Sequence, residues 1–229
     1  MGMAARTDMN MGLMSTDMTA LPTKELLILQ NWFSPSFPIG VFSYSSGLET
    51  AIARVDVHDR DSLTVWLNTV LQHGNLFTDA VFLNATMDGS KVNDLCLALC
   101  ASAERYQETT ELGASFCRVI HETQKLDLPG GLAYPVAVGL AARQLGFDRA
   151  ATVAAFLQGS CMNLISVAVR AVPIGQMDGQ ACLTSLIPII ETASANAMTT
   201  AIEDAGNFAM AADLCALEHE TATQRIYRT

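Results

Sequence analysis

The sequence lacks the short motifs that carry most enzyme chemistry. It has no GxxxxGK[ST] phosphate-binding loop, no GxGxxG, no GxSxG and no HExxH. Its histidines (His58, His73, His121 and His219) are far apart in the chain. They are typical of surface or partly buried residues, although imidazole also suits a transient nickel contact. The sequence gives no basis for a hydrolase or a kinase, so we predict that the protein is not an enzyme.

Positive charge is also scarce. The 229 residues include 13 Lys and Arg against 23 Asp and Glu, and the formal net charge is -10. No two basic residues are adjacent, and no apolar run reaches the roughly 20 residues of a membrane span. An acidic chain repels phosphate groups, so we expect neither nucleic acid nor an anionic membrane as a partner.

The six cysteines form no CxxC pair. They lie in apolar helical contexts, and a chain of this size does not need a disulfide framework. We interpret them as reduced core thiols of a cytoplasmic protein. Cys96 and Cys100, spaced i, i+4, could instead hold a soft metal ion, but their apolar neighbours favour core packing.

Strand patterns are rare, whereas amphipathic helical patterns recur along the chain. Half of the residues are apolar and the predicted connections are short, which favours an all-α fold. We predict a single compact multi-helix domain of about ten helices over residues 21–218. A Met-rich disordered leader is expected at 1–20 and a polar tail, disordered when free, at 219–229.

Local signals place several helix boundaries. Asp59 or Asp61 is expected to cap a helix that ends at Gly74, and Asp148 is expected to cap the longest helix, over about 149–170. Pro135 suits a first helical position. Further helices are predicted at the following ranges: about 76–88, 91–106, 109–125, 179–198 and 199–218, with Pro188 kinking or interrupting the fourth.

The segment 34–49 cannot begin as a regular helix, because it contains Pro35, Pro38 and Gly40. Ser46 and Glu49 have the spacing of a capping box for the next helix. Capping also accounts for two of the serines of the Ser43-Tyr44-Ser45-Ser46 cluster, and we favour it over a nucleophile or oxyanion site. The aromatic side chains of this segment (Phe37, Phe42 and Tyr44) could anchor a partner protein, since a rigid loop loses little entropy on docking.

The same segment, from Ser34-Pro35-Ser36-Phe37-Pro38-Ile39-Gly40 to Ser46-Gly47-Leu48-Glu49, resembles the hallmark of the urease accessory protein F family. The resemblance runs from about residue 24 to 229, because other stretches also match the motifs of this family in the same order. These stretches are Glu108-Thr109-Thr110-Glu111, Tyr134-Pro135-Val136, Ala168-Val169-Arg170-Ala171-Val172-Pro173-Ile174-Gly175-Gln176, and the tail Gln224-Arg225-Ile226-Tyr227-Arg228-Thr229.

This resemblance implies an all-α protein that dimerises and acts as a chaperone in urease maturation. It implies an adaptor that binds and regulates the GTPase UreG, together with UreD (UreH in some systems), on apo-urease. Nickel would be handled by the complex, with no cofactor bound tightly and no metal ligands in this chain. The alternatives are a helical ligand-binding protein that uses the 34–49 loop, with a deep polar pocket there, and a purely structural subunit.

The expected partner-binding residues follow from the same motifs. They are Phe37, Gly40, Phe42, Tyr44, Gly47, Glu49, Arg170, Gln176, Arg225, Tyr227 and Arg228. Arg170 has a second interpretation, because a cation at a helix C-terminus is also favoured by the helix dipole. The basic and aromatic residues of the tail are expected to become ordered on a partner surface.

Overall fold

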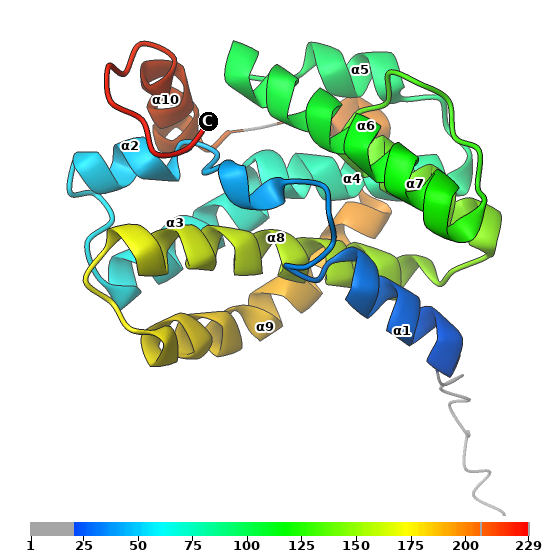
Figure 1. The fold of residues 1–229 in the computed structure, drawn as a ribbon, viewed down its shortest axis with the longest axis horizontal. Helices are drawn as coiled ribbons and strands as arrows, with labels where there is room; N and C mark the ends of the chain where they lie inside the picture. The colour runs from blue at the N-terminus through cyan, green and yellow to red at the C-terminus, as the bar shows by residue number, and fades with distance from the viewer. Residues whose placement is uncertain (1–20, 207, 229) are drawn as a thin grey trace, which may run out of the picture.

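A computed structural model of the chain describes residues 21–206 and 208–228; the predicted leader, 1–20, lies outside this range. The elements, in chain order, are α1 (Thr23–Trp32), η1 (Val41–Ser43), α2 (Leu48–Ala53), α3 (Arg60–His73), α4 (Asn75–Asp88), α5 (Asn93–Ala98), α6 (Ala103–Gln124), α7 (Tyr134–Leu145), α8 (Arg149–Ala171), α9 (Gln176–Thr199), η2 (Ile202–Asp204) and α10 (Met210–His219). Figure 1 shows them gathered in one body. The predicted all-α fold is confirmed.

Two layers of helices meet in the core. In the first, α8 packs on α9 and α9 packs on α3; in the second, α4 packs on α7 and α7 on α6. Helix α4 also contacts α8 and α9, so it joins the two layers (Figure 1). Aromatic rings fill the centre: the Trp32 and Phe116 rings meet edge-on at 5.2 Å between centroids.

Helix α8 is long and apolar enough to cross a membrane by length and composition alone. Half of its most apolar stretch is buried inside the protein, on α9, α4 and α2. Its apolar face is therefore the face of a core helix.

Several predicted boundaries are confirmed by the caps. Asp59 accepts the Ser62 N–H at 2.8 Å, and Ser62 returns the contact in a capping box at the start of α3. Asp148 accepts the Ala151 N–H at 2.8 Å at the start of α8. Pro135 lies in the first turn of α7, where its missing N–H costs no hydrogen bond.

Other boundaries differ from the prediction. The expected helices at 91–106 and 109–125 are divided earlier, because the Ser102 hydroxyl caps α6 by accepting the Arg105 N–H at 3.0 Å. Helix α9 runs through Pro188 without interruption. Pro188 is exposed, so water can satisfy the carbonyl that its ring leaves without a donor. The last predicted helix is replaced by η2 and the shorter α10.

The capping box predicted for Ser46 and Glu49 is wrong. Helix α2 begins at Leu48, and Gly47 in the left-handed conformation, with a φ of 81°, takes the N-cap position. The Ser46 hydroxyl donates to Glu108 on α6 at 3.2 Å. The Glu49 carboxylate turns towards the end of the chain, which makes it available for the contacts described next.

Candidate functional site: a C-terminal strap against the 41–49 segment

The last described residues of the chain lie on the protein body. We call residues 220–228 the strap; in Figure 1 it runs back from α10 past α2. The Arg228 N–H donates to the Ser43 carbonyl at 2.8 Å, and Tyr227 is only 6% exposed. The expectation of a disordered tail is wrong for these described residues. The tail lacks an apolar stripe, and its order comes from long-range polar contacts instead.

Glu49 is the first of these contacts. Its carboxylate accepts the Ile226 N–H at 2.8 Å and the Tyr227 N–H at 2.9 Å, and it lies 3.1 Å from Nε2 of His219. Burial alone would raise the pKa of Glu49, but these three hydrogen bonds bring it below its usual value. The carboxylate therefore stays ionised and holds the strap backbone to α2.

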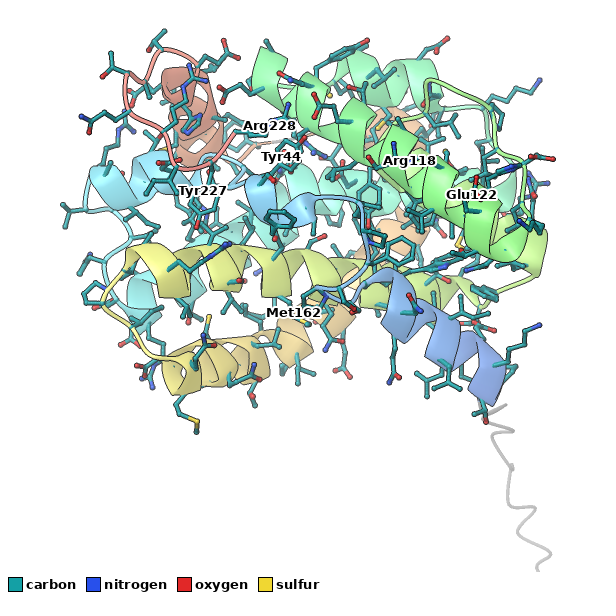
Figure 2. The ribbon with its side chains drawn as sticks, viewed as in Figure 1. Tyr44, Arg118, Glu122, Met162, Tyr227 and Arg228 are labelled. Atoms are coloured by element: carbon teal, nitrogen blue, oxygen red, sulfur yellow. The ribbon has the colours of Figure 1, made fainter. Side chains whose placement is uncertain are left out.

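Tyr44, Glu111 and Arg228 form the second contact. The Tyr44 hydroxyl donates to Glu111 at 2.6 Å, while the Arg228 guanidinium donates to Glu111 at 2.6 and 2.9 Å and to the Tyr44 oxygen at 3.1 Å. These hydrogen bonds, with that from Gln107, lower the pKa of Glu111 to about 2. Burial and the adjacent Glu111 raise the pKa of Tyr44 above its usual value. Figure 2 shows Tyr44 and Arg228 side by side.

Arg170, at the end of α8, lies over the Tyr227 ring, with 5.3 Å from its guanidinium carbon to the ring centroid. Its Nε donates to the Ser166 carbonyl at 3.0 Å. Among the residues that the structure describes, no carboxylate forms an ion pair with Arg170. The cation is exposed and thus available to an external acidic group.

These side chains surround an open depression, which we call the hollow. It has a volume of about 400 Å³ and is lined by Phe42, Ser43, Arg170, Ala171, Ile226, Tyr227 and Arg228. Phe42 is 60% exposed and Ile226 is 80% exposed. Two large apolar side chains beside two guanidinium groups, on a chain of net charge -10, suit a macromolecular partner more than a small substrate.

Two glycines shape the segment below the hollow. Gly40 turns the chain into η1 with a φ of 80°, and the space where a Cβ would point is empty. At Gly47 a Cβ would lie 2.9 Å from the Ala216 backbone nitrogen, so only glycine lets α2 approach α10 this closely.

A further hydrogen bond joins this segment to α8: the Asn163 side chain donates to the Tyr44 carbonyl at 3.3 Å.

The structure separates the predicted partner-binding residues into groups. Five line the hollow or bound it: Phe42, Tyr44, Arg170, Tyr227 and Arg228. Phe37 is buried against Phe116, with 5.9 Å between ring centroids, and Tyr44 is 3% exposed, so neither ring is an exposed anchor. Gln176 is exposed at the start of α9 and is not among the side chains that line the hollow.

Sequence reasoning missed His219. The sequence favours a surface or partly buried histidine at this position, but His219 is buried. Its Nδ1 lies 2.8 Å from Glu104 on α6, and its Nε2 faces Glu49 on α2. The one available signal is its i, i+4 spacing from Cys215, because both residues lie on the buried side of α10.

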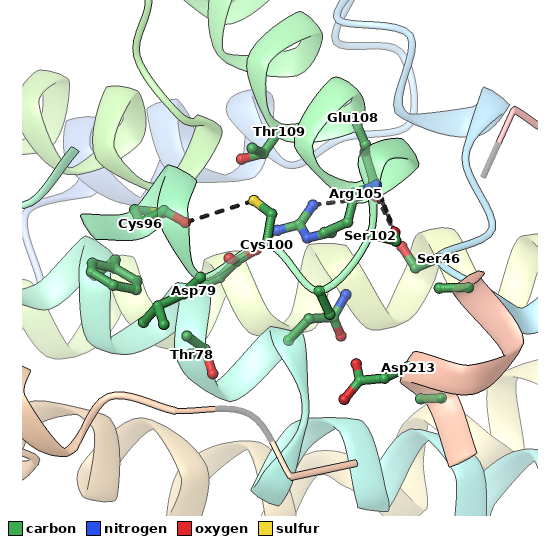
Figure 3. A pocket seen from close by; sticks show the side chains of 16 residues that line it. Ser46, Thr78, Asp79, Cys96, Cys100, Ser102, Arg105, Glu108, Thr109 and Asp213 are labelled. Atoms are coloured by element: carbon green, nitrogen blue, oxygen red, sulfur yellow. Dashed lines mark hydrogen bonds and ion pairs between the residues drawn. The ribbon is translucent and has the colours of Figure 1, made fainter. Parts of the chain in front are cut away.

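A second polar cluster lies in a small pocket between α4, α6 and α10 (Figure 3). Arg105 forms ion pairs with Asp79 and Glu108, and burial raises the pKa of both carboxyl groups. The cavity of about 40 Å³ holds a few waters at most. It is too small for the substrate pocket that a ligand-binding protein would need.

Cys96 and Cys100 border this pocket (Figure 3). Burial raises the pKa of both thiols, which keeps them protonated and inert. Within residues 21–206 and 208–228, no group of three or more His, Cys, Asp or Glu side chains is arranged to hold a metal ion. These findings favour core packing over metal binding for the two cysteines.

Comparison with known proteins identifies relatives that match most of the chain. A family model described as UreF matches residues 57–187. The urease accessory protein UreF of Rhodopseudomonas palustris (strain BisB5) is 40% identical, over 93% of this chain and 94% of its own. Proteins of the same name from Roseobacter denitrificans and Cereibacter sphaeroides (strain KD131) are 36% and 42% identical, over 93% and 89% of this chain and 98% of each of theirs.

The family model covers more than half of the chain, and the relatives match it almost from end to end. The matched residues 57–187 form the helical body from α3 to α9, whereas the segment 41–49 and the strap lie outside the range of the family model. The chain belongs to the urease accessory protein UreF family.

Proposed function

We propose that this protein acts as an adaptor in the maturation of urease. In the cytoplasm it binds the GTPase UreG together with UreD (UreH), as a homodimer docked on apo-urease, and makes nickel release depend on the correct target. Nickel is the cargo of this complex, and this chain carries out no reaction on it. The single observation that carries the proposal is the hollow, where exposed Phe42 and Ile226 lie beside Arg170, a cation with no acidic partner among the described residues.

The chemistry of the hollow supports docking. The exposed apolar side chains that line it can be buried by a partner, and its guanidinium groups can pair with carboxylates on that partner. The strap and the 41–46 segment are fixed by hydrogen bonds before any partner arrives. A surface ordered in advance loses less conformational entropy on binding, which favours affinity.

The direct test is co-purification of the protein with UreG and UreD, with the mass of the complex as readout. Removing residues 224–229 deletes most of the strap but keeps His219 and the helical body. We expect the truncated protein to keep its thermal unfolding midpoint within a few degrees and to lose the complex. Intact co-purification with both partners would contradict the proposal.

A second arm tests the point of contact. Phe42→Ala removes the exposed ring from the hollow, and Val65→Ala on α3, where Val65 is 66% exposed, is the matched control. We expect only the first substitution to weaken the complex, by about tenfold or more if Phe42 is an interface anchor. Equal effects of both would place the interface elsewhere.

GTP turnover by UreG, measured with and without this protein, separates the proposal from its alternatives. An adaptor changes the rate of turnover, and a purely structural subunit leaves it unchanged. A ligand-binding protein would instead require a pocket of at least about 300 Å³ with converging polar groups. The polar pocket beside Ser46 has only about 40 Å³, and the larger hollow is an open depression, so neither is the deep polar pocket that this alternative expects.

A further inference from the structure

His219 lies between two carboxylates that also hold the strap. Its side chain is 1% exposed, and the side chains of Glu49 and Glu104 are 16% and 9% exposed. Glu49 accepts the Ile226 and Tyr227 backbone N–H groups, while Glu104 accepts Nη1 of Arg225 at 2.7 Å. Both carboxylates are therefore shared between His219 and the strap.

The protonation state of the imidazole follows from this geometry. A carboxylate can only accept hydrogen bonds, and a neutral imidazole carries an N–H on one of its two nitrogens. With neutral His219, one carboxylate would face a nitrogen lone pair in a buried site, which is repulsive. The imidazolium donates from both nitrogens and satisfies both carboxylates.

The charges of the groups around His219 also favour the imidazolium. Glu49 and Glu104 contribute two negative charges and Arg225 contributes one positive charge, so a protonated His219 makes the buried cluster neutral. The surrounding groups do not supply this missing charge. Arg54, which follows α2, pairs with Glu218, and Glu220 accepts the Ala103 N–H. Arg105 pairs with Asp79 and Glu108 in the adjacent pocket.

We propose that His219 is a positioning residue that holds the strap closed as a buried imidazolium, so that closure of the strap takes up a proton. The hollow then depends on the charge of His219, because Ile226 and Tyr227 line it and their backbone N–H groups bind Glu49. A group that binds its proton more tightly in the closed form stabilises that form at low pH and loses this effect as pH rises. This inference concerns the isolated chain and does not depend on any partner.

The test uses hydrogen exchange of the Ile226 and Tyr227 amides, expressed as protection factors, which remove the intrinsic effect of pH on exchange. Between about pH 6 and pH 9, a range that includes the ordinary titration of histidine and extends above it, we expect the protection of both amides to fall. Amides in the middle of α8 serve as the internal reference. Constant protection at Ile226 and Tyr227 over this range would overturn the proposal.

The variant H219Q keeps a similar volume but cannot donate from two nitrogens of one charged ring. We expect it to lower the protection of both amides at about pH 6 by about tenfold or more, since hydrogen bonds to charged groups are lost. It should also remove their pH dependence. The matched control is H121Q on α6, because His121 also lies 2.8 Å from a carboxylate, that of Asp127, but is exposed. Unchanged protection in H219Q would overturn the proposal.

The unaltered protein gives an independent readout if H219Q fails to fold. Nitrogen chemical shifts of the His219 ring distinguish an imidazolium from either neutral tautomer. We expect both ring nitrogens to be protonated at about pH 6, together with protected strap amides. A neutral tautomer at that pH with the strap still protected would overturn the proposal.

Discussion

Arg228 reaches back over 184 positions to donate a hydrogen bond to the Tyr44 hydroxyl at 3.1 Å, and its guanidinium carbon lies 5.3 Å from the centre of the Tyr44 ring. The same guanidinium binds both oxygens of Glu111. One side chain thus connects the strap, the 41–46 segment and α6. The hollow should therefore depend on the planar shape of the Arg228 guanidinium as well as on its positive charge.

Arg228→Lys tests this dependence. Lysine keeps the charge but cannot bind a carboxylate in two-point fashion, so we expect the strap to loosen. Hydrogen-exchange protection of the Arg228 and Tyr227 amides should fall by several-fold, while the thermal midpoint of the helical body changes by no more than about 2 °C. The control is Arg118→Lys on the exposed side of α6 (Figure 2). Equal protection in both variants would show that a positive charge is sufficient.

Tyr44→Phe removes one hydroxyl and keeps the ring. We expect the free energy of unfolding to fall by about 1–2 kcal/mol, because Glu111 and Arg228 each lose a hydrogen bond at a partly buried site. Urea unfolding measures this as a lower midpoint with an unchanged slope. A midpoint equal to that of the unaltered protein would show that water replaces the hydroxyl without cost.

The lowered pKa of Glu111 leads us to expect that the strap loosens in acid. Its pKa is lowered to about 2 from a usual value of 4.5, so its stabilising effect is complete above the usual value and is lost as pH falls towards 2. The carboxyl carbon shift of Glu111 and the Arg228 amide shift should change together in this range. Glu122, an exposed residue of the same helix (Figure 2), is the internal reference. Titration of Glu111 at the usual value would contradict the prediction.

Gly40 and Gly47 form a matched pair, since both have φ values near 80°. Alanine at Gly40 meets open space and should cost only the backbone strain of about 1 kcal/mol. Alanine at Gly47 adds a contact of 2.9 Å with the Ala216 backbone nitrogen, so its cost should be larger by about 1–3 kcal/mol. Chemical denaturation of the two variants measures the difference. Equal costs would mean that α10 moves away freely.

Arg170→Ala should fold normally, because its guanidinium is exposed and forms no ion pair within the described part of the chain. Under the proposed function, we expect it to reduce urease activation in cells that carry the urease genes. Arg118→Ala, another exposed arginine, should leave activation intact. Unchanged activation with Arg170→Ala would leave Arg170 with only its role in stacking on Tyr227.

The sequence predicted the fold class and most helix boundaries because those depend on local signals. The caps at Asp59 and Asp148 and the glycine after α7 act within a few residues of where they stand. The local signals gave a wrong prediction where a residue distant in the sequence binds the side chain instead. Glu49 has the spacing of a capping residue, but two backbone N–H groups from the strap bind its carboxylate instead.

The site was predicted in composition but not in geometry. The motifs gave Phe42, Arg170, Tyr227 and Arg228, which the fold brings together from three separate segments. The motifs did not predict that Phe37 is buried or that the strap is ordered on the protein body. A polar tail resembles a disordered one until its hydrogen-bond acceptors are known, and those acceptors lie on α2 and α6.

The contacts of the strap also bear on the order of folding. Those to Glu49 and Tyr44 join residues 177 to 184 positions apart, whereas the helical hairpins form from near neighbours. Closing so long a loop is unfavourable until the bundle has brought its ends together, so the strap should dock after the helices have packed. It should also be the segment that opens first in the native state, which would let the hollow appear and disappear while the bundle stays folded.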